Sequence, residues 1–177
     1  MQRLKFKRRL VLCLGLALMF ASGTTASRAQ QTGIKVSGTI IAANVFLQVI
    51  NFDDTKGHRL SLAQSEGMNT STGEHAFLDS GEVMIAGTDD LVNGTGPGLG
   101  YTKIVKGEDA VYLKREAKIT TTIPPKGETA TTFEGAFTFT KGTGQYQNIR
   151  GSGTYKGKYV SKTIYRIEWE GEYTLEK

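Results

Sequence analysis

The sequence predicts an all-β protein that folds as a single closed antiparallel β-barrel of about eight strands. Three observations predict it: apolar and polar residues alternate with a period of two, turn residues separate the alternating segments, and no long stretch after residue 29 keeps a helical period. A barrel is favoured over a sandwich because closure removes the edges that exposed strands present. No linker or shift in composition divides residues 30–177, which indicates one domain.

The first half of the barrel is predicted from segments rich in β-forming residues. We expect strands at Ile34–Ile41, Ala43–Phe52, His58–Glu66, Gly81–Ala86 and Leu99–Val105. The segment DDTKG at 53–57 and the run NGTGPGLG at 93–100 carry the Asp, Asn and Gly residues that turns favour. Both are therefore predicted to be connections between strands.

The second half shows the clearest alternation. In Thr163–Leu175 the odd positions are mainly apolar, and the even positions include Arg166 and three glutamates. Residues 132–140 alternate in the same manner around three phenylalanines. The segment Val111–Ile119 also alternates, but Arg115 lies on its apolar side. With Gly151–Tyr159, these segments complete the predicted set of about eight or nine strands.

Residues 1–29 have the three parts of a secretory signal peptide. A basic start (MQRLKFKRRL) precedes the apolar run Leu10–Ala21 and a small, polar stretch that ends in Ser27-Arg28-Ala29. We expect cleavage after Ala29, with Ala26 as second choice, and a secreted or periplasmic mature protein. The apolar run is shorter than the roughly 20 residues that a helix needs to cross a bilayer, so we expect no membrane span.

The charge of the mature chain disfavours nucleic acid as a partner. The sequence has 22 Lys and Arg against 17 Asp and Glu, but six of the basic residues lie in residues 1–29. The remaining 16 basic and 17 acidic groups leave the body nearly neutral, whereas a phosphate backbone needs a clustered basic patch. Cys13, the only cysteine, lies in the leader. Disulfides, thiolate metal sites and a cysteine nucleophile are therefore not expected in the mature protein.

A glycine-rich pattern in the last third carries a family resemblance. The stretch FEGAFTFTKGTGQYQNIRGSGTYKGKY contains GTGQY at 142–146 and GSGTY at 151–155. It resembles the strand, turn and strand signature of plant allene oxide cyclases, of dirigent proteins and of bacterial secreted barrels in the same superfamily. The resemblance covers roughly residues 80–160 and carries over no catalytic position, because the signature is structural.

The resemblance implies a calycin-type, eight-stranded barrel of the allene oxide cyclase kind, with an apolar lumen and assembly into dimers or trimers. It also implies roles for the glycines and tyrosines of the two repeats. The glycines would take positive φ or permit a close approach, and the tyrosines would pack beside them. These residues are Gly142, Gly144, Gly151, Gly153, Tyr146 and Tyr155.

Aromatic side chains on the apolar faces are core residues first, and three of them are candidate lumen residues. We expect Phe137, Tyr165 and Trp169 to share a lumen that suits a small apolar or aromatic molecule. Arg115 needs a carboxylate, a carbonyl or a ligand anion as partner, because an unpaired charge in a dry interior is costly. It lies either at the barrel rim or in a subunit interface, or it binds a ligand.

The strand from His58 to Glu66 supplies further candidates. Its even positions share one face, which would orient a ligand or move a proton if it faced the lumen, and would be an ordinary surface if it faced outward. Tyr101 is a further candidate for stabilising charge in the lumen. The pairs Asp53-Asp54 and Asp89-Asp90 are expected at turns. The sequence shows no recognisable spacing of metal ligands, so we expect neither a metal nor a cofactor.

Three functions remain open on the sequence. The first is an exported barrel that binds a small apolar or aromatic molecule in its lumen, without established catalysis. The second is a cofactor-independent cyclase or isomerase, in which His58, Glu66, Tyr101 or Arg115 stabilises charge on a hydrophobic substrate. The third is a structural or partner-binding envelope protein that uses its outer face. An open lumen favours the first two functions, and a filled lumen favours the third.

Overall fold

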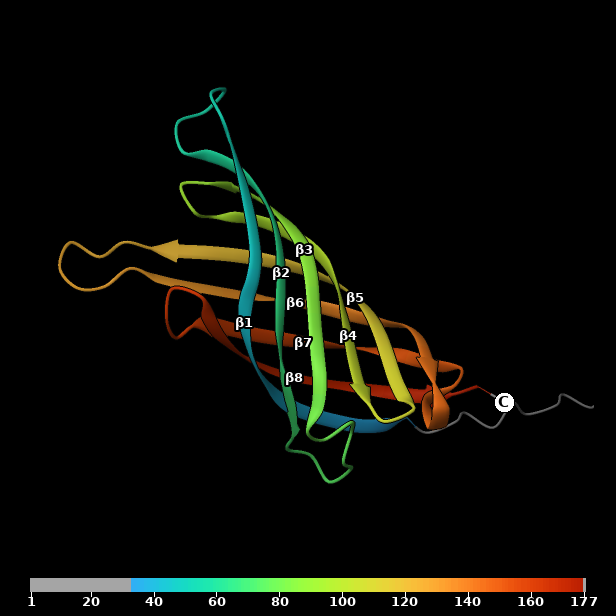
Figure 1. Cartoon of the computed structure of the whole chain (residues 1–177). Coiled ribbons are helices and arrows are strands. Elements are labelled where there is room, and N and C mark those ends of the chain that lie inside the picture. The colour runs from blue at the N-terminus through green and yellow to red at the C-terminus, as the bar shows by residue number, and fades with distance from the viewer. Residues whose placement is uncertain (1–32, 177) are drawn as a thin grey trace, which may run out of the picture. The chain divides into compact units, whose positions relative to one another are not determined.

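The computed structural model describes residues 33–176, and the predicted signal peptide lies outside these residues. The described chain forms a closed antiparallel barrel in which each strand pairs with the next and β8 pairs with β1 (Figure 1). The prediction of an all-β closed barrel of about eight strands is confirmed. The strands are β1 (Ile34–Phe52), β2 (His58–Ser71), β3 (Gly81–Val92), β4 (Gly96–Lys106), β5 (Asp109–Thr122), β6 (Ala130–Thr143), β7 (Ile149–Tyr159) and β8 (Ile164–Leu175), and the short 3-10 helix η1 (Gly144–Tyr146) lies between β6 and β7.

β1 joins two segments that were expected to be separate strands. It continues from Ile34 to Phe52, with a bulge between Asn44 and Phe46 where it pairs with β2. The inserted residue reverses the alternation. Before the bulge, even positions such as Ile40 are buried, and after it, odd positions such as Leu47 line the lumen. The expectation of two strands was wrong because a bulge interrupts the period of two without ending the ladder.

The connection between β3 and β4 is shorter than expected. β3 runs on to Val92 and β4 begins at Gly96, so only residues 93–95 remain outside the strands. Asn93 and Gly94 supply the positive φ values (52° and 78°) that a tight hairpin needs. The glycines at 96–100 belong to the sheet, because glycine is tolerated in a strand where another group approaches closely.

The glycine-rich repeats behave as the family resemblance implied. Gly144 and Gly151 take positive φ values of 59° and 144°, and Tyr146 and Tyr155 are buried. Gly171 on β8 lies two strands from Phe137 on β6, and a Cβ atom at Gly171 would lie 3.0 Å from the Phe137 ring. A glycine there therefore lets this aromatic ring lie directly against the strand.

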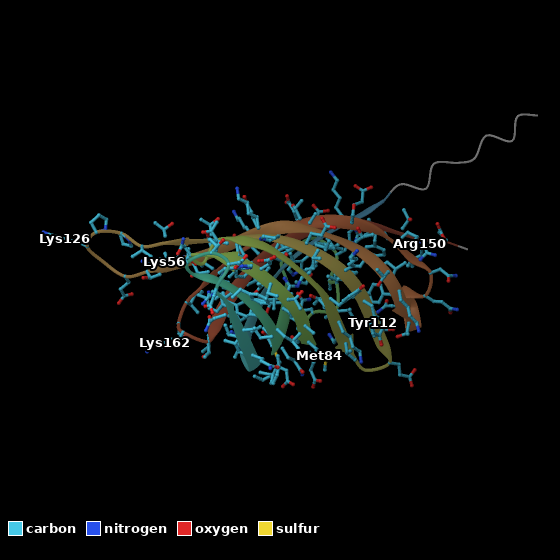
Figure 2. All side chains as sticks on the ribbon, turned by 90° about the horizontal axis from the view of Figure 1, so that it is seen from above. Lys56, Met84, Tyr112, Lys126, Arg150 and Lys162 are labelled. Carbon is cyan, nitrogen blue, oxygen red and sulfur yellow. The ribbon has the colours of Figure 1, made fainter. Side chains whose placement is uncertain are left out.

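The two ends of the barrel differ. The β1–β2, β3–β4, β5–β6 and β7–β8 connections lie at one end, which we call the mouth (upper left in Figure 1). Figure 2 places Lys56, Lys126 and Lys162 at this end and Arg150 at the other. The opposite end is plugged by the β2–β3 loop (72–80), because this loop carries the buried side chains of Phe77 and Leu78 into the core.

Aromatic contacts and a buried amide hold this plug. The Phe77 ring lies 4.9–5.7 Å, between centroids, from the rings of Phe139, Tyr146, Trp169 and Tyr173. The Nδ2 of Asn69 donates to the carbonyl oxygens of Phe77 (2.9 Å) and Leu78 (3.1 Å). Its Oδ1 accepts a hydrogen bond of 3.0 Å from the indole of Trp169. The Asn69 amide thus supplies hydrogen-bond partners for two backbone carbonyls of a loop that enters the core.

Candidate functional site

The interior holds two spaces of different size. The mouth chamber opens between the loops of the mouth and has a volume of ≈ 810 Å³. The inner cavity has a volume of ≈ 40 Å³ and is lined mainly by apolar and aromatic side chains, including Phe77 of the plug. Ile85, Arg115 and Ile167 line both spaces and mark the boundary between them. Pockets for small molecules have volumes of roughly 300–1,000 Å³, so the mouth chamber is the candidate site.

Two glycines make room for the Arg115 guanidinium at this boundary. Arg115 on β5 pairs with Gly100 on β4, which in turn pairs with Gly87 on β3. A Cβ atom would lie 3.0 Å from Nη2 at Gly87 and 3.2 Å from it at Gly100. Side chains at these positions would press on the guanidinium, so the glycine pair forms a niche for it.

The Arg115 guanidinium is incompletely hydrogen-bonded. Nη1 donates a long hydrogen bond of 3.5 Å to the Tyr155 hydroxyl, which itself donates to the Glu116 carbonyl at 2.9 Å. Nε is buried and has no hydrogen-bond partner among residues 33–176. Leaving donors of a charged group unpaired costs free energy. Because the side chain lines the mouth chamber, an anion there that accepts hydrogen bonds from the guanidinium would be stabilised.

Asp89 adds a partly buried carboxyl group to the mouth chamber. It accepts a hydrogen bond of 3.3 Å from the Ser61 hydroxyl on β2. Burial raises the pKa of Asp89 above its ordinary value, although the Arg115 charge and the Ser61 hydroxyl act in the opposite direction. The chamber therefore combines a permanent cation with a carboxyl group that keeps its proton to a higher pH than a solvated aspartate does.

Other polar groups of the chamber come from neighbouring strands. Tyr165 on β8 lines the chamber, and burial raises the pKa of its hydroxyl. Ser65 on β2 donates a hydrogen bond of 2.8 Å to Asn44 on β1, and both residues line the same space. These uncharged groups can orient a polar substituent of a ligand without a large desolvation cost.

Four of the residues predicted for the lumen face the interior. Arg115 and Tyr165 line the mouth chamber, and Arg115, Phe137 and Trp169 line the inner cavity. The rings of Phe137 and Trp169 lie 6.4 Å apart. Tyr165 lines a different space from the other two aromatic residues, which corrects the expectation of one lumen shared by all three.

The other three predicted residues, His58, Glu66 and Tyr101, lie on the outer face of the barrel, which corrects the expected lumen placement. Tyr101 is 61% exposed. In β2 the odd positions line the mouth chamber, namely Arg59, Ser61, Ala63 and Ser65, so the even positions point outward. The alternation predicted that His58 and Glu66 share a face, but a period of two does not say which face is interior. Small residues at positions 61, 63 and 65 suit the confined side.

His58 joins three segments at the mouth. Its Nδ1 lies 2.6 Å from a carboxylate oxygen of Asp54 in the β1–β2 turn, and its Nε2 lies 2.9 Å from one of Asp90 on β3. The ring packs at 5.3 Å from the ring of Phe52 on β1. The hydrogen bonds to Asp54 and then to Asp90 raise the pKa of His58. A protonated imidazole satisfies both carboxylates, and we call these three polar residues the His58 clasp.

The described residues show no grouped metal ligands. Within residues 33–176 no three His, Cys, Asp or Glu side chains are placed to hold a metal ion. Over the same residues, no helix is long and apolar enough to cross a membrane.

Sequence reasoning missed Asp89 as a lumen residue. It was expected at a turn together with Asp90, but β3 continues through both residues. The alternation of β3 contained the signal that identifies it, because Val83, Ile85 and Leu91 are buried on the face that Asp89 shares. A charged residue in phase with an apolar face is the same signal that singled out Arg115.

No protein-family model matches the sequence, and no curated protein matches it. Among solved structures, the chain is similar to a pterocarpan synthase dirigent protein, with a TM-score of 0.48, 11% identity, and coverage of 92% of this chain and 100% of that chain. It is also similar to a pyocyanin demethylase, with a TM-score of 0.38, 14% identity, and coverage of 76% and 99%.

At these identities the likeness concerns the arrangement of strands alone. The function is therefore argued from the residues of the lumen.

Proposed function

We propose that this chain is an exported barrel protein that binds a small apolar or aromatic molecule in its mouth chamber, with one anionic group of the ligand held by Arg115. The observation that carries the proposal is the Arg115 guanidinium, which lines the chamber and makes one long hydrogen bond, of 3.5 Å, within residues 33–176. A carboxylate or sulfonate would accept charge-assisted hydrogen bonds, which are stronger than neutral ones. Export rests on the predicted signal peptide at residues 1–29.

The chamber lining supports an apolar body for the ligand. Apolar side chains from five strands face this space, namely Leu47, Val49, Leu91, Ile119, Phe133 and Ile167. Burial of apolar ligand surface against them contributes about 25 cal/mol per Å². A mainly apolar pocket with a few convergent polar groups is the usual form of a small-molecule site.

The test compares decyl sulfonate with decanol, which has the same chain length and no charge. Trp169 is the only tryptophan and lines the inner cavity together with Arg115, so its emission reports occupancy near the guanidinium. We expect decyl sulfonate to bind the exported protein, and Arg115→Leu to weaken it by roughly 1.5–3 kcal/mol, the contribution of a hydrogen bond to a charged group. Decanol should be nearly unaffected by this substitution.

Arg150→Leu is the matched control, because it removes an arginine that is exposed at the other end of the barrel. It should leave the binding of both compounds unchanged. If equilibrium dialysis finds that neither compound binds the unmodified protein, the binding proposal is wrong and the structural function is favoured.

A cofactor-independent cyclase or isomerase is the second candidate function, and Asp89 is the observation that favours it. A carboxyl group with a raised pKa can exchange a proton with a substrate, while Arg115 in the same chamber stabilises a developing negative charge. The test uses a compound that copurifies with the exported protein and is identified by mass spectrometry. If the unmodified protein turns this compound over, and Asp89→Asn still binds the compound but no longer turns it over, catalysis is supported. If the unmodified protein binds the compound without turning it over, catalysis on this compound is excluded.

The outer face supports a further part of the proposal, which is association with other copies of the chain. Across β1–β4, eight outward side chains are large, apolar and exposed, namely Ile41, Phe46, Ile50, Leu62, Met68, Met84, Leu99 and Tyr101. The outward residues of β5–β8 are mainly charged residues and threonines. Large exposed apolar patches mark interaction surfaces, so we assign the face of β1–β4 to an interface.

The charges within this face fit a second copy as the partner. Met84 pairs with Glu66 on one side and with Lys103 on the other. A two-fold axis that passes Met84 in the interface and runs parallel to β3 would place each of these charges opposite its counter-charge on the other copy. The self-complementary arrangement supports a homo-oligomer.

Sedimentation equilibrium of the exported protein at micromolar concentration tests this assignment. We expect a dimer or trimer, and we expect Met84→Glu to shift it toward monomer, since a charge would be buried in the interface. Thr138→Glu is the control, because Thr138 faces outward on β6, beside Lys114. An unmodified protein that sediments as a monomer would contradict association and favour a different partner on this face.

A further inference from the structure

We infer that the anionic group of the ligand enters the barrel first and that the apolar part remains toward the mouth. This inference rests on the proposed binding function and adds the orientation of the bound molecule. It also defines the ligand class: an apolar chain or ring system at one end and a single anionic group at the other. Three features of the interior lead to this orientation.

The first feature is the depth of Arg115 in the lumen. It lies at the inner end of the mouth chamber, since it lines the inner cavity as well. Ile119, on the same face of β5, lines the chamber nearer to the β5–β6 loop. At about 3.3 Å per strand residue, the two positions are roughly 13 Å apart along the strand. An anion bound by Arg115 therefore leaves a length of apolar wall between itself and the mouth.

The second feature is the lack of room beyond Arg115. The inner cavity of ≈ 40 Å³ has space for about one water molecule, whose share of liquid volume is about 30 Å³. The plug residue Phe77, together with Phe137 and Phe139, lines this cavity. An apolar tail that entered first would have to displace these packed rings, which is unfavourable.

The third feature is the apolar part of the rim of the mouth chamber. Arg59, Glu128 and Lys162 also line the chamber, but all three are exposed, and exposed charges attract an anion only weakly. Leu47, Val49 and Val160 line the chamber and are 56%, 42% and 57% exposed. A ligand tail that lies toward the mouth would remove these side chains from water, which is favourable in proportion to the apolar area that is covered. An anion in the same place would leave them exposed.

Asp89 is the acidic residue that interacts with Arg115 in the chamber. Asp89 also lines the mouth chamber, and an ionised carboxylate there would repel an anionic head. Burial raises the pKa of Asp89, which disfavours its ionised form. Among the described residues, Arg115 is also the one charged side chain that lines the inner cavity, whereas Asp89 lines the mouth chamber alone. The inner end of the chamber therefore presents a cation.

The experiment uses two forms of decanoate, one brominated close to the carboxylate and one at the terminal carbon. Bromine quenches tryptophan emission at short range, and Trp169 lines the inner cavity that Arg115 also lines. Equilibrium dialysis on the exported protein measures binding separately from quenching. At saturation, we expect the acid with bromine near its carboxylate to quench Trp169 severalfold more than the acid with terminal bromine.

Equal quenching by the two acids, or stronger quenching by the terminal bromine, would overturn the orientation and leave the binding function intact. If dialysis finds that neither acid binds, the orientation and the proposed binding function both fail. These outcomes separate the two proposals, because dialysis reports binding and the bromine position reports direction.

Variants at Arg115 test the anchor. Arg115→Leu should lower the affinity for both acids by about tenfold or more, as expected for a hydrogen bond to a charged group, and should remove the difference in quenching. Arg115→Lys keeps a cation in place and should keep the order of quenching, which covers the case in which the leucine variant does not fold. Arg150→Leu should behave as the unmodified protein. A full difference in quenching that persists in Arg115→Leu would overturn the anchoring role.

Discussion

Arg115 and Asp89 carry opposite charges in one chamber, yet their surroundings act on them differently. The Gly87–Gly100 niche makes room for the guanidinium, and arginine stays charged at every physiological pH. The carboxyl group of Asp89 loses hydration without a strong partner in return, and burial raises its pKa. Between these two residues, the balance of charge therefore shifts toward the cation as the pH falls.

Asp89→Asn should stabilise the protein at neutral pH. Because the folded state raises the pKa of Asp89, its ionised form opposes folding, and this unfavourable contribution disappears as the pH falls through the folded-state pKa. The neutral asparagine removes it at every pH, and the gain should be on the order of 1 kcal/mol. Urea unfolding at about pH 7 and at about pH 4 measures both the gain and its loss on acidification. A variant less stable than the unmodified protein at neutral pH would show that the attraction to Arg115 outweighs desolvation.

The His58 clasp should make stability depend on pH in the opposite sense. The carboxylates of Asp54 and Asp90 raise the folded-state pKa of His58, so the contribution of the clasp is complete below the unfolded pKa of about 6.5. It is lost as the pH rises through the folded-state pKa. Urea midpoints between about pH 6 and pH 9 should fall for the unmodified protein and fall less for His58→Gln.

His75→Gln is the control for this effect, since His75 is the other histidine of the chain and lies exposed in the β2–β3 loop. It should keep the pH dependence of the unmodified protein. An unchanged slope in His58→Gln would show that the clasp does not contribute to stability.

Among the structural elements, the β2–β3 loop has the largest effect on the interior. It inserts Phe77, 1% exposed, among four aromatic rings and closes the inner end. Leu78 and Ser80 take positive φ values of 44° and 60°, a conformation that disfavours residues other than glycine. The hydrogen bonds of Asn69 hold the loop against this strain.

Phe77→Ala should therefore be among the most destabilising single substitutions. Loss of a fully buried phenylalanine ring typically lowers the free energy of unfolding by about 3–5 kcal/mol, and urea unfolding measures it. Ile123→Ala is the control, because Ile123 is exposed in the β5–β6 loop and its loss should change stability by no more than about 0.5 kcal/mol. A loss below about 1 kcal/mol for Phe77→Ala would mean that the loop does not act as a plug.

For the whole molecule, the barrel separates a ligand chamber from an outer face of two kinds. The interior narrows from the mouth toward the plug, and the outer wall is apolar over β1–β4 and charged over β5–β8. Closure pairs every strand on both sides, so association between copies has to use side chains rather than free strand edges. The binding site and the proposed interface therefore lie on opposite sides of the same wall.

The mature protein should begin at Gln30. The basic start, the apolar run and the SRA triplet of residues 1–29 predict cleavage after Ala29. N-terminal sequencing and intact mass of the protein from the exported fraction of its natural host measure the cleavage site. A start at Ser27 would mean cleavage after Ala26, and an intact Met1 would contradict processing.

The alternation in the sequence was sufficient for the type of fold and for the set of residues that share each face. Thr163–Leu175 shows why: a strand period of two places Tyr165, Ile167 and Trp169 on one side whatever the rest of the chain does. The same rule identified Arg115 as a charge on an apolar face. These properties are local, since they depend on backbone geometry within one strand.

Which face is interior, and what space it encloses, depended on contacts between residues far apart in the chain. The even face of β2 is polar enough to line a site, but packing put the small odd residues inside and His58 and Glu66 outside. The bulge in β1, the plug formed by Phe77 and the boundary at Arg115 likewise arise from pairing and packing between distant strands. A sequence period records the direction of a side chain relative to its own strand, and only closure of the barrel decides which direction is inward.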